Sequence, residues 1–240
     1  MTTDLNRLQV KIFADGANLK DIIEMNSNPL IKGLTTNPTL MKKEGVKNYK
    51  SFAQEVLSVV TDKPISFEVF SDDLDEMYRQ ALKIASWGEN VFVKIPITNS
   101  QGISTNKLVA KLVKDGVKVN ITAVMTLEQV KLISLSLVPE VPNYVSIFAG
   151  RIADTGVDPI DIMKKSLELL RPIKSTELIW ASPRELLNIF QASEIKCHVI
   201  TATTDILKKL NLVGYDLNKY SLDTVRMFYN DAVESKFYIE

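Results

Sequence analysis

Short apolar runs rich in valine, isoleucine and phenylalanine recur along the chain at intervals of roughly 20 to 30 residues. Turn-forming residues flank each run, a combination typical of buried β-strands. The pattern predicts eight strands, at Lys11–Asp15, Ile31–Thr35, Ile65–Phe70, Val91–Ile97, Lys118–Val124, Tyr144–Ala149, Glu177–Ala181 and Cys197–Thr201.

Amphipathic stretches separate the predicted strands. Asp72–Trp87 and Asp158–Leu170 repeat apolar residues at helical spacing, and a last stretch of this kind, Leu222–Ser235, follows the eighth strand. Asp158 is a suitable N-cap, with Pro159 at the first helical position. The chain is therefore predicted to alternate strand and helix throughout.

This alternation requires a parallel sheet covered by helices. Eight units without an interrupting domain predict an α/β fold of the closed (β/α)8 TIM-barrel type. We expect residues 1–240 to form a single domain with a C-terminal helical segment at about 221–237. An open doubly wound sheet is the alternative, but no Gly-x-Gly-x-x-Gly motif follows the first strand.

Composition narrows the classes of partner. Basic and acidic residues number 29 each, so the net charge of zero favours neither nucleic acid nor an anionic membrane as a partner. No run is long and apolar enough for a membrane helix, and no signal peptide is recognisable. One cysteine and one histidine argue against a disulfide and a zinc site. The single cysteine also fits a reducing cytoplasm, which is the expected location.

Because barrel enzymes place their sites at the carboxyl ends of the strands, charged residues inside strand runs are candidates for chemistry. Lys94 lies within Val91–Ile97, where burial would favour a neutral, nucleophilic amine. The alternative is a lysine that reaches out to solvent. Glu68 lies within the third run and suits a general acid/base or a salt bridge. Asp15 ends the first run, as a catalytic group or a turn residue.

Neutral polar residues also stand at predicted strand ends. Thr35 and Asn37 close the second run, where Asn37 suits either a substrate hydroxyl or the start of a helix. Asn120 and Thr122 alternate on the fifth run, so they share one face of that strand. A polar face that points into a barrel indicates a site, although threonine is common in strands.

Two arginines follow the sixth and seventh runs. Ser146, Phe148 and Arg151 cluster at the end of the sixth. Ser182 and Arg184 end the seventh, where a helix with a proline in its first turn is predicted to begin. Helix N–H groups beside an arginine would bind a phosphate, and late barrel loops often do so. The alternative is a pair of ordinary surface arginines.

Six motifs in order resemble those of the transaldolase family of class I aldolases. They are Ala-Asp15-Gly, Gly-Leu-Thr35-Thr36-Asn37-Pro38, Val-Phe-Val-Lys94-Ile-Pro, Val-Asn120-Ile-Thr122, Ser146-Ile-Phe148-Ala-Gly-Arg151-Ile and Ala-Ser182-Pro-Arg184. The resemblance runs from about residue 11 to about residue 201. The second and third motifs are the most specific.

The resemblance implies that Lys94 forms a Schiff base with a ketose and keeps a dihydroxyacetone unit for transfer to an aldose. It implies that Asp15 takes and returns the C4-hydroxyl proton. Glu68 and Thr122 would hold the catalytic water. Asn37, Asn120 and Ser146 would hold the dihydroxyacetone unit, and Arg151, Ser182 and Arg184 the phosphate. No metal or organic cofactor would be needed, because the iminium is the electron sink.

Other readings stay open. Within the family, Glu68 and Phe148 match transaldolases, whereas fructose-6-phosphate aldolases carry glutamine and tyrosine there. The chain's length resembles the short branch, which includes those aldolases and commonly forms rings. A homo-oligomer in which residues 221–237 pack on a neighbouring subunit is therefore expected. A barrel acting on another ketose phosphate and a non-catalytic sugar-phosphate-binding barrel are the further alternatives.

Overall fold

In the computed structural model, which describes residues 5–239, eight parallel strands close into a barrel in sequence order. The strands are β1 (Lys11–Asp15), β2 (Ile31–Thr35), β3 (Ile65–Glu68), β4 (Val91–Pro96), β5 (Val119–Val124), β6 (Asn143–Ile147), β7 (Thr176–Trp180) and β8 (Val199–Thr203). The β1–β8 pairing closes the ring. The predicted TIM barrel is confirmed.

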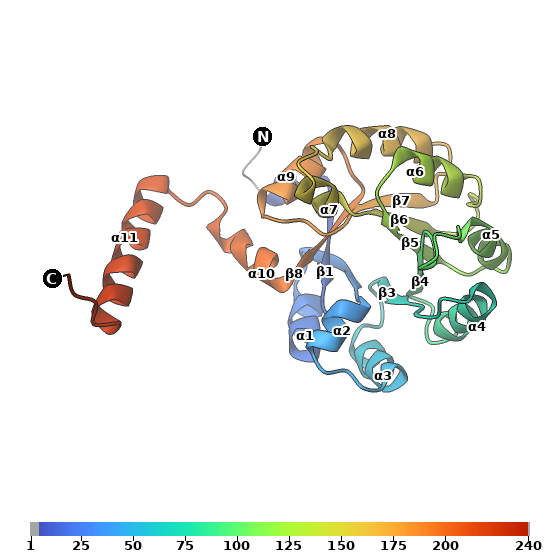
Figure 1. Ribbon diagram of the computed structural model, residues 1–240, viewed down its shortest axis with the longest axis horizontal. Helices are drawn as coiled ribbons and strands as arrows, with labels where there is room; N and C mark the ends of the chain where they lie inside the picture. Colours follow the sequence, from blue (N-terminus) through green and yellow to red (C-terminus); the bar gives the residue numbers. More distant parts are fainter. Residues whose placement is uncertain (1–4, 240) are drawn as a thin grey trace.

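Helices surround the barrel (Figure 1). The short 3-10 helices are η1 (Leu5–Arg7) and η2 (Lys209–Leu212). The α-helices are α1 (Leu19–Ser27), α2 (Pro38–Lys43), α3 (Tyr49–Val59), α4 (Leu74–Ala85), α5 (Asn106–Lys114), α6 (Leu127–Ser134), α7 (Ala149–Asp154), α8 (Ile160–Leu170), α9 (Leu187–Glu194), α10 (Thr204–Lys208) and α11 (Leu217–Glu234).

Several predicted boundaries differ from those of the structure by one or two residues, and in two of these cases the physical reason is visible. Helix α8 begins after Pro159, which is itself the N-cap, while the Asp158 carboxylate accepts from the Ile160 amide at 2.9 Å. Strand β3 ends at Glu68, although the apolar pattern continues to Phe70. The Phe70 side chain is 65% exposed, because β3 leaves the sheet before reaching it.

The predicted helix directly after Ser182 was also wrong. Ser182 has a positive φ of 59°, and α9 begins only at Leu187. The Asn188 side chain accepts from the amides of Arg184 and Glu185, at 2.8 and 3.1 Å. These bonds hold residues 183–186 in a turn ahead of the helix.

The lower part of the barrel interior, toward the amino ends of the strands, is filled by aromatic rings. Phe13 on β1 and Phe92 on β4 contact Tyr144 on β6, with ring centroids 5.6 and 4.5 Å apart. Gly33 on β2 makes room for this packing, since a Cβ there would lie 2.5 Å from the Phe13 ring. These packed rings fill the barrel interior below the level of the strands' carboxyl ends.

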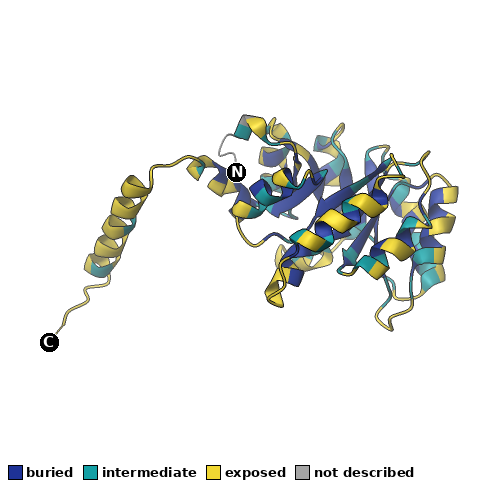
Figure 2. Cartoon of the chain, turned by 90° about the horizontal axis from the view of Figure 1, so that it is seen from above, coloured by how far each residue is buried: buried dark blue, intermediate teal, exposed yellow. Residues whose placement is uncertain are grey.

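Helix α11 lies apart from the barrel, beyond α10 and η2 (Figure 1). Figure 2 shows it exposed along its length, in contrast to the buried strands. Its start is fixed by Asp216, whose side chain accepts from the Lys219 amide. The predicted helix at Leu222–Ser235 is present but begins earlier, at Leu217.

Candidate active site

A cavity of about 540 Å³ opens at the carboxyl ends of the strands. Of the predicted site residues, all except Asn120 line it. The lining comprises Asp15, Thr35, Asn37, Pro38, Thr39, Leu40, Glu68, Lys94, Thr122, Ala123, Ser146, Phe148, Arg151, Ala181, Ser182, Pro183, Arg184, Thr201 and Thr203. The strands thus bring together side chains that are far apart in sequence.

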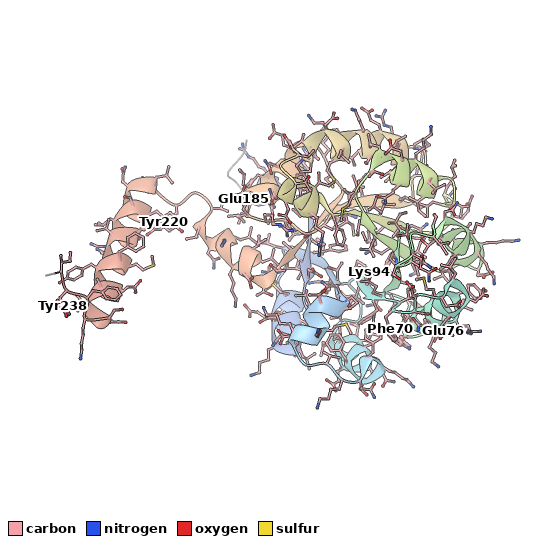
Figure 3. The ribbon with its side chains drawn as sticks, viewed as in Figure 1. Phe70, Glu76, Lys94, Glu185, Tyr220 and Tyr238 are labelled. Atoms are coloured by element: carbon pink, nitrogen blue, oxygen red, sulfur yellow. The ribbon has the colours of Figure 1, made fainter. Side chains whose placement is uncertain are left out.

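Lys94 lies near the middle of the barrel (Figure 3). Its side chain is 7% exposed, and its Nζ donates to the Thr36 carbonyl oxygen at 2.9 Å. The Glu68 carboxylate, on the neighbouring strand, lies 3.3 Å from Nζ. Lys94 is thus a buried amine that faces the cavity, with the Glu68 carboxylate and the Thr36 carbonyl oxygen beside it.

Asp15 faces the same cavity from β1. The Thr35 hydroxyl donates to its Oδ1 at 2.8 Å, and the Asn37 amide donates to Oδ2 at 3.2 Å. Burial raises the pKa of Asp15 above its usual range, while Lys94 and these two hydrogen bonds act in the opposite direction. A carboxylate whose pKa is raised is a stronger proton acceptor once it is ionised.

A second chain of hydrogen bonds runs below the cavity floor. Asn120, on β5, is fully buried, and its side chain links β3 to β6 by donating to Ser66 Oγ at 3.0 Å and accepting from Ser146 Oγ at 2.7 Å. Asn120 therefore orients Ser146, which lines the cavity. Nearby, the Thr122 hydroxyl is buried with no hydrogen-bond partner in the described structure. An unpartnered hydroxyl at a cavity wall is suited to a bound water or substrate.

The arginines lie at the rim of the cavity. Arg151 is exposed, with its guanidinium 5.9 Å from the centroid of the Phe148 ring. Arg184 donates from Nη1 to the Ser182 hydroxyl at 2.9 Å and from Nε to Asp154 at 2.8 Å. The hydrogen bonds from Arg184 lower the pKa of Asp154 below its usual range.

The loop that carries Ser182 lies against the start of α7. A Cβ on Gly150 would lie 1.5 Å from the Ser182 carbonyl oxygen, so only glycine permits this approach. The expected anion site at a helix start after Ser182 does not exist as predicted. Arg151, Ser182 and Arg184 instead line the same cavity, where α7 and the loop after β7 are packed closely.

The transaldolase/fructose-6-phosphate aldolase family model matches residues 12–238. The chain belongs to this family. It is 35% identical to a probable transaldolase of Thermoanaerobacter sp. over 202 residues, covering 84% of this chain and 89% of the relative. A probable transaldolase of Dehalococcoides mccartyi is 33% identical, with 84% and 90% covered.

Solved structures with low identity support the fold of this transaldolase-family chain. Dihydrodipicolinate synthase of Bacillus clausii superimposes with a TM-score of 0.61 at 8% identity, covering 95% of this chain and 80% of the other. The protein KGPDC of Streptococcus mutans gives 0.57 at 9% identity, covering 83% and 90%. These likenesses concern the barrel alone.

Sequence reasoning missed several residues that line or support this cavity. Thr201 on β8 shares a 2.6 Å hydrogen bond with Thr35, and Asp154 on α7 holds Arg184. Ser66 supports Asn120 from β3. Thr201 and Ser66 lie within apolar strand runs. The only signal in the sequence was that each places a hydroxyl at a strand position facing the barrel interior. Asp154 is an ordinary helix residue in sequence.

Within residues 5–239 no three His, Cys, Asp or Glu side chains gather closely enough to hold a metal ion. Among the helices that the structure describes, none combines the length and apolarity needed to cross a bilayer.

Proposed function

We propose that this protein is a transaldolase that transfers a dihydroxyacetone unit between sugar phosphates through a Schiff base on Lys94. The donors would be sedoheptulose 7-phosphate or fructose 6-phosphate, and the acceptors glyceraldehyde 3-phosphate or erythrose 4-phosphate. The observation that carries the proposal is the buried Lys94 amine, 3.3 Å from Glu68, in a cavity that it shares with Asp15. Family membership supports sugar phosphates as the substrate class.

In the first step the neutral Lys94 amine attacks the C2 carbonyl of the ketose, forming a carbinolamine. Loss of water then gives the iminium ion. Glu68 would pass protons through a water held with the Thr122 hydroxyl, whose lack of a protein partner leaves it free to bind that water. The iminium then withdraws electrons from C3, so the reaction requires no metal or organic cofactor.

In the second step Asp15 removes the proton of the C4 hydroxyl. The C3–C4 bond breaks, its electrons form an enamine on Lys94, and the aldose fragment leaves. The enamine carbon then attacks the carbonyl of an acceptor aldose, and Asp15 returns its proton to the new hydroxyl. Reversal of imine formation releases the new ketose.

The remaining polar residues suit the two ends of the substrate. Asn37 and Ser146 would hold the dihydroxyacetone hydroxyls, with Asn120 acting through its hydrogen bond to Ser146. Arg151, Arg184 and the Ser182 hydroxyl lie at the rim, where a phosphate would remain accessible to solvent. Thr35 would act by orienting Asp15, and Phe148 would cover the sugar.

Fructose-6-phosphate aldolase activity, with release of free dihydroxyacetone, is the second candidate. The family includes both reactions. Glu68 and Phe148, the residues that resemble transaldolases rather than those aldolases, favour transfer. A non-catalytic sugar-phosphate-binding barrel would not need Lys94, Asp15 and Glu68 in one cavity.

Borohydride reduction with fructose 6-phosphate, followed by peptide mass spectrometry, tests the Schiff base. We expect a stable three-carbon adduct on Lys94 when an aldose acceptor is absent. A folded protein with no adduct on Lys94 would refute the mechanism. Assays with and without erythrose 4-phosphate then separate the activities, since a transaldolase makes product only with the acceptor.

Helix α11 supports the proposed homo-oligomer. It carries exposed apolar side chains along its length, including Leu217, Val225, Phe228 and Tyr229. We propose that this surface packs on a second copy of the chain. The cytoplasmic location of the protein is a separate point and stays a prediction. Light scattering should give an oligomer for the full chain and a smaller species for a chain ending at Tyr215. A full-length monomer would exclude this assembly.

A further inference from the structure

The Tyr49 hydroxyl binds both main-chain polar groups of Glu68. It accepts a hydrogen bond from the Glu68 amide at 2.7 Å and donates one to the Glu68 carbonyl oxygen at 2.9 Å. In a parallel sheet these two groups would normally bond to a neighbouring strand. Here a side chain of α3 takes the place of that strand.

The cause lies in the early end of β2. The β2–β3 pairing covers only Leu34 with Ile65 and Thr35 with Ser66, and the Thr36 amide makes the last ladder bond. If the ladder continued, the Glu68 amide would donate to the Thr36 carbonyl oxygen. The amide of residue 38 would then donate to the Glu68 carbonyl oxygen.

Neither continuation is available. Residue 38 is proline, which has no N–H to donate, and it begins α2. The Thr36 carbonyl oxygen instead accepts a hydrogen bond from Lys94 Nζ, 2.9 Å away. The break between β2 and β3 therefore serves both ends of the Lys94–Glu68 pair: it frees a carbonyl for the lysine and leaves the glutamate backbone to Tyr49.

The Tyr49 side chain is held firmly enough to act as a fixed partner. Its ring meets Phe67, Phe70 and Trp87 edge to face, with centroids 6.2, 5.5 and 5.6 Å apart. Figure 3 labels Phe70 on the side of the barrel that carries α3 and α4. A ring fixed on three sides places its hydroxyl with little freedom.

We propose that Tyr49 is a positioning residue, whose hydroxyl fixes the end of β3 and thereby keeps the Glu68 carboxylate beside Lys94. This rests on the proposed function in so far as Glu68 handles protons during formation of the Schiff base. Tyr49 itself is not among the residues lining the active-site cavity, so it acts only through Glu68.

Tyr49→Phe tests this role, because it keeps the ring contacts and removes only the hydroxyl. We expect kcat to fall roughly tenfold with KM changed by less than about twofold, since a misplaced catalytic group affects the chemical step. Tyr78→Phe is the matched control: its hydroxyl bonds Asp115 on the surface, so activity should stay unchanged. A Tyr49→Phe kcat within twofold of wild type would overturn the proposal.

A double-mutant cycle separates positioning from general destabilisation. In a Glu68→Gln background, Tyr49→Phe should have little further effect on kcat, because the carboxylate through which it acts is gone. An equal loss in both backgrounds contradicts a role through Glu68, and points to a merely structural one. Thermal unfolding of all four proteins shows that they are folded.

A substrate-independent measurement distinguishes failure of this proposal from failure of the proposed function. The protein is treated with formaldehyde and cyanoborohydride, and the rate at which Lys94 becomes methylated is followed by peptide mass spectrometry. Formaldehyde forms an imine with Lys94 without any sugar phosphate, and the Glu68 carboxylate that handles protons in this step lies 3.3 Å from Nζ. A misplaced carboxylate in Tyr49→Phe should therefore slow methylation of Lys94 roughly threefold, but not in the Glu68→Gln background. An unchanged rate refutes the positioning role even if no sugar phosphate reacts.

Discussion

The two ends of the barrel interior are built on the same strands but differ in chemistry. On β1 the buried Phe13 is followed two residues later by Asp15, and on β4 Phe92 is followed by Lys94. Alternate residues of a strand face the same side, so each pair points into the barrel at successive levels. The lower level is aromatic and closed, and the upper level is polar and open to the cavity.

This contrast shows how one small structure can be both stable and reactive. The aromatic level supplies burial and fixes strand positions. The upper level contains partly paired charges, an unpartnered Thr122 hydroxyl and left-handed backbone at Ala123 and Ser182. Features that reduce stability are therefore gathered at the end where the chemistry is proposed, as expected of functional sites.

The largest effect should come from replacing Lys94 at the upper end, and the same substitution of a lysine at the lower end is the comparison. Lys94→Met should lower kcat by about 10⁴-fold or more and abolish borohydride trapping, because no other group of the cavity offers a buried amine. Lys11→Met removes a lysine that pairs with Glu177 at the lower end, 2.6 Å away. That partly exposed pair is worth about 0–1 kcal/mol, so activity should persist. Equal losses in both variants would break the contrast between the two ends.

Asp15→Asn should separate activity from stability at the upper end. We expect kcat to fall by about 10²–10⁴-fold, because the proton acceptor for the C4 hydroxyl is lost. Burial raises the pKa of Asp15 in the folded protein, so the wild-type protein loses stability as pH rises through that pKa. The melting temperature of the variant should therefore exceed that of wild type at pH 7, and the gap should shrink toward pH 4. A lower melting temperature at pH 7 would contradict this sign.

Phe13→Ala tests the lower end. Removing a fully buried ring should cost about 3–5 kcal/mol of unfolding free energy, measured by urea denaturation. Folded enzyme should keep most of its kcat, because Phe13 lies one level below the catalytic side chains. If kcat falls as far as in Asp15→Asn while the protein stays folded, the two levels are not independent.

The sequence predicts the barrel because periodicity is a local signal. Short apolar runs and amphipathic stretches identify eight strand–helix units, and charged residues such as Lys94 stand out inside them. The errors arise where long-range contacts decide. Ser182 was expected at a helix start, but the Asn188 side chain delays the helix. Strand β3 stops at Glu68 because β2 has already turned away.

The partners of the candidate catalytic residues were beyond prediction for the same reason. Tyr49 is an unremarkable helix residue in sequence, and its bond to Glu68 spans 19 positions. Thr201 meets Thr35 across 166 positions, because β8 closes the ring beside β1. Only the closed topology places such residues together. Roles in binding and catalysis that rest on the family resemblance remain predictions.

Thr35→Val should give the smallest effect and sharpen the account of the upper level. The Thr35 hydroxyl has one proton, which it donates to Asp15, so Thr201 is the donor in the bond between the two threonines. Burial raises the pKa of Asp15, and the bond from Thr35 opposes that rise. Removing it should move the acidic limb of the kcat profile to higher pH, with a loss of a few-fold in kcat at neutral pH. Thr201→Val, which leaves the Thr35–Asp15 bond in place, should move the limb much less. Equal displacement by the two variants would mean that the hydroxyl pair, and not the direct bond to Asp15, sets its titration.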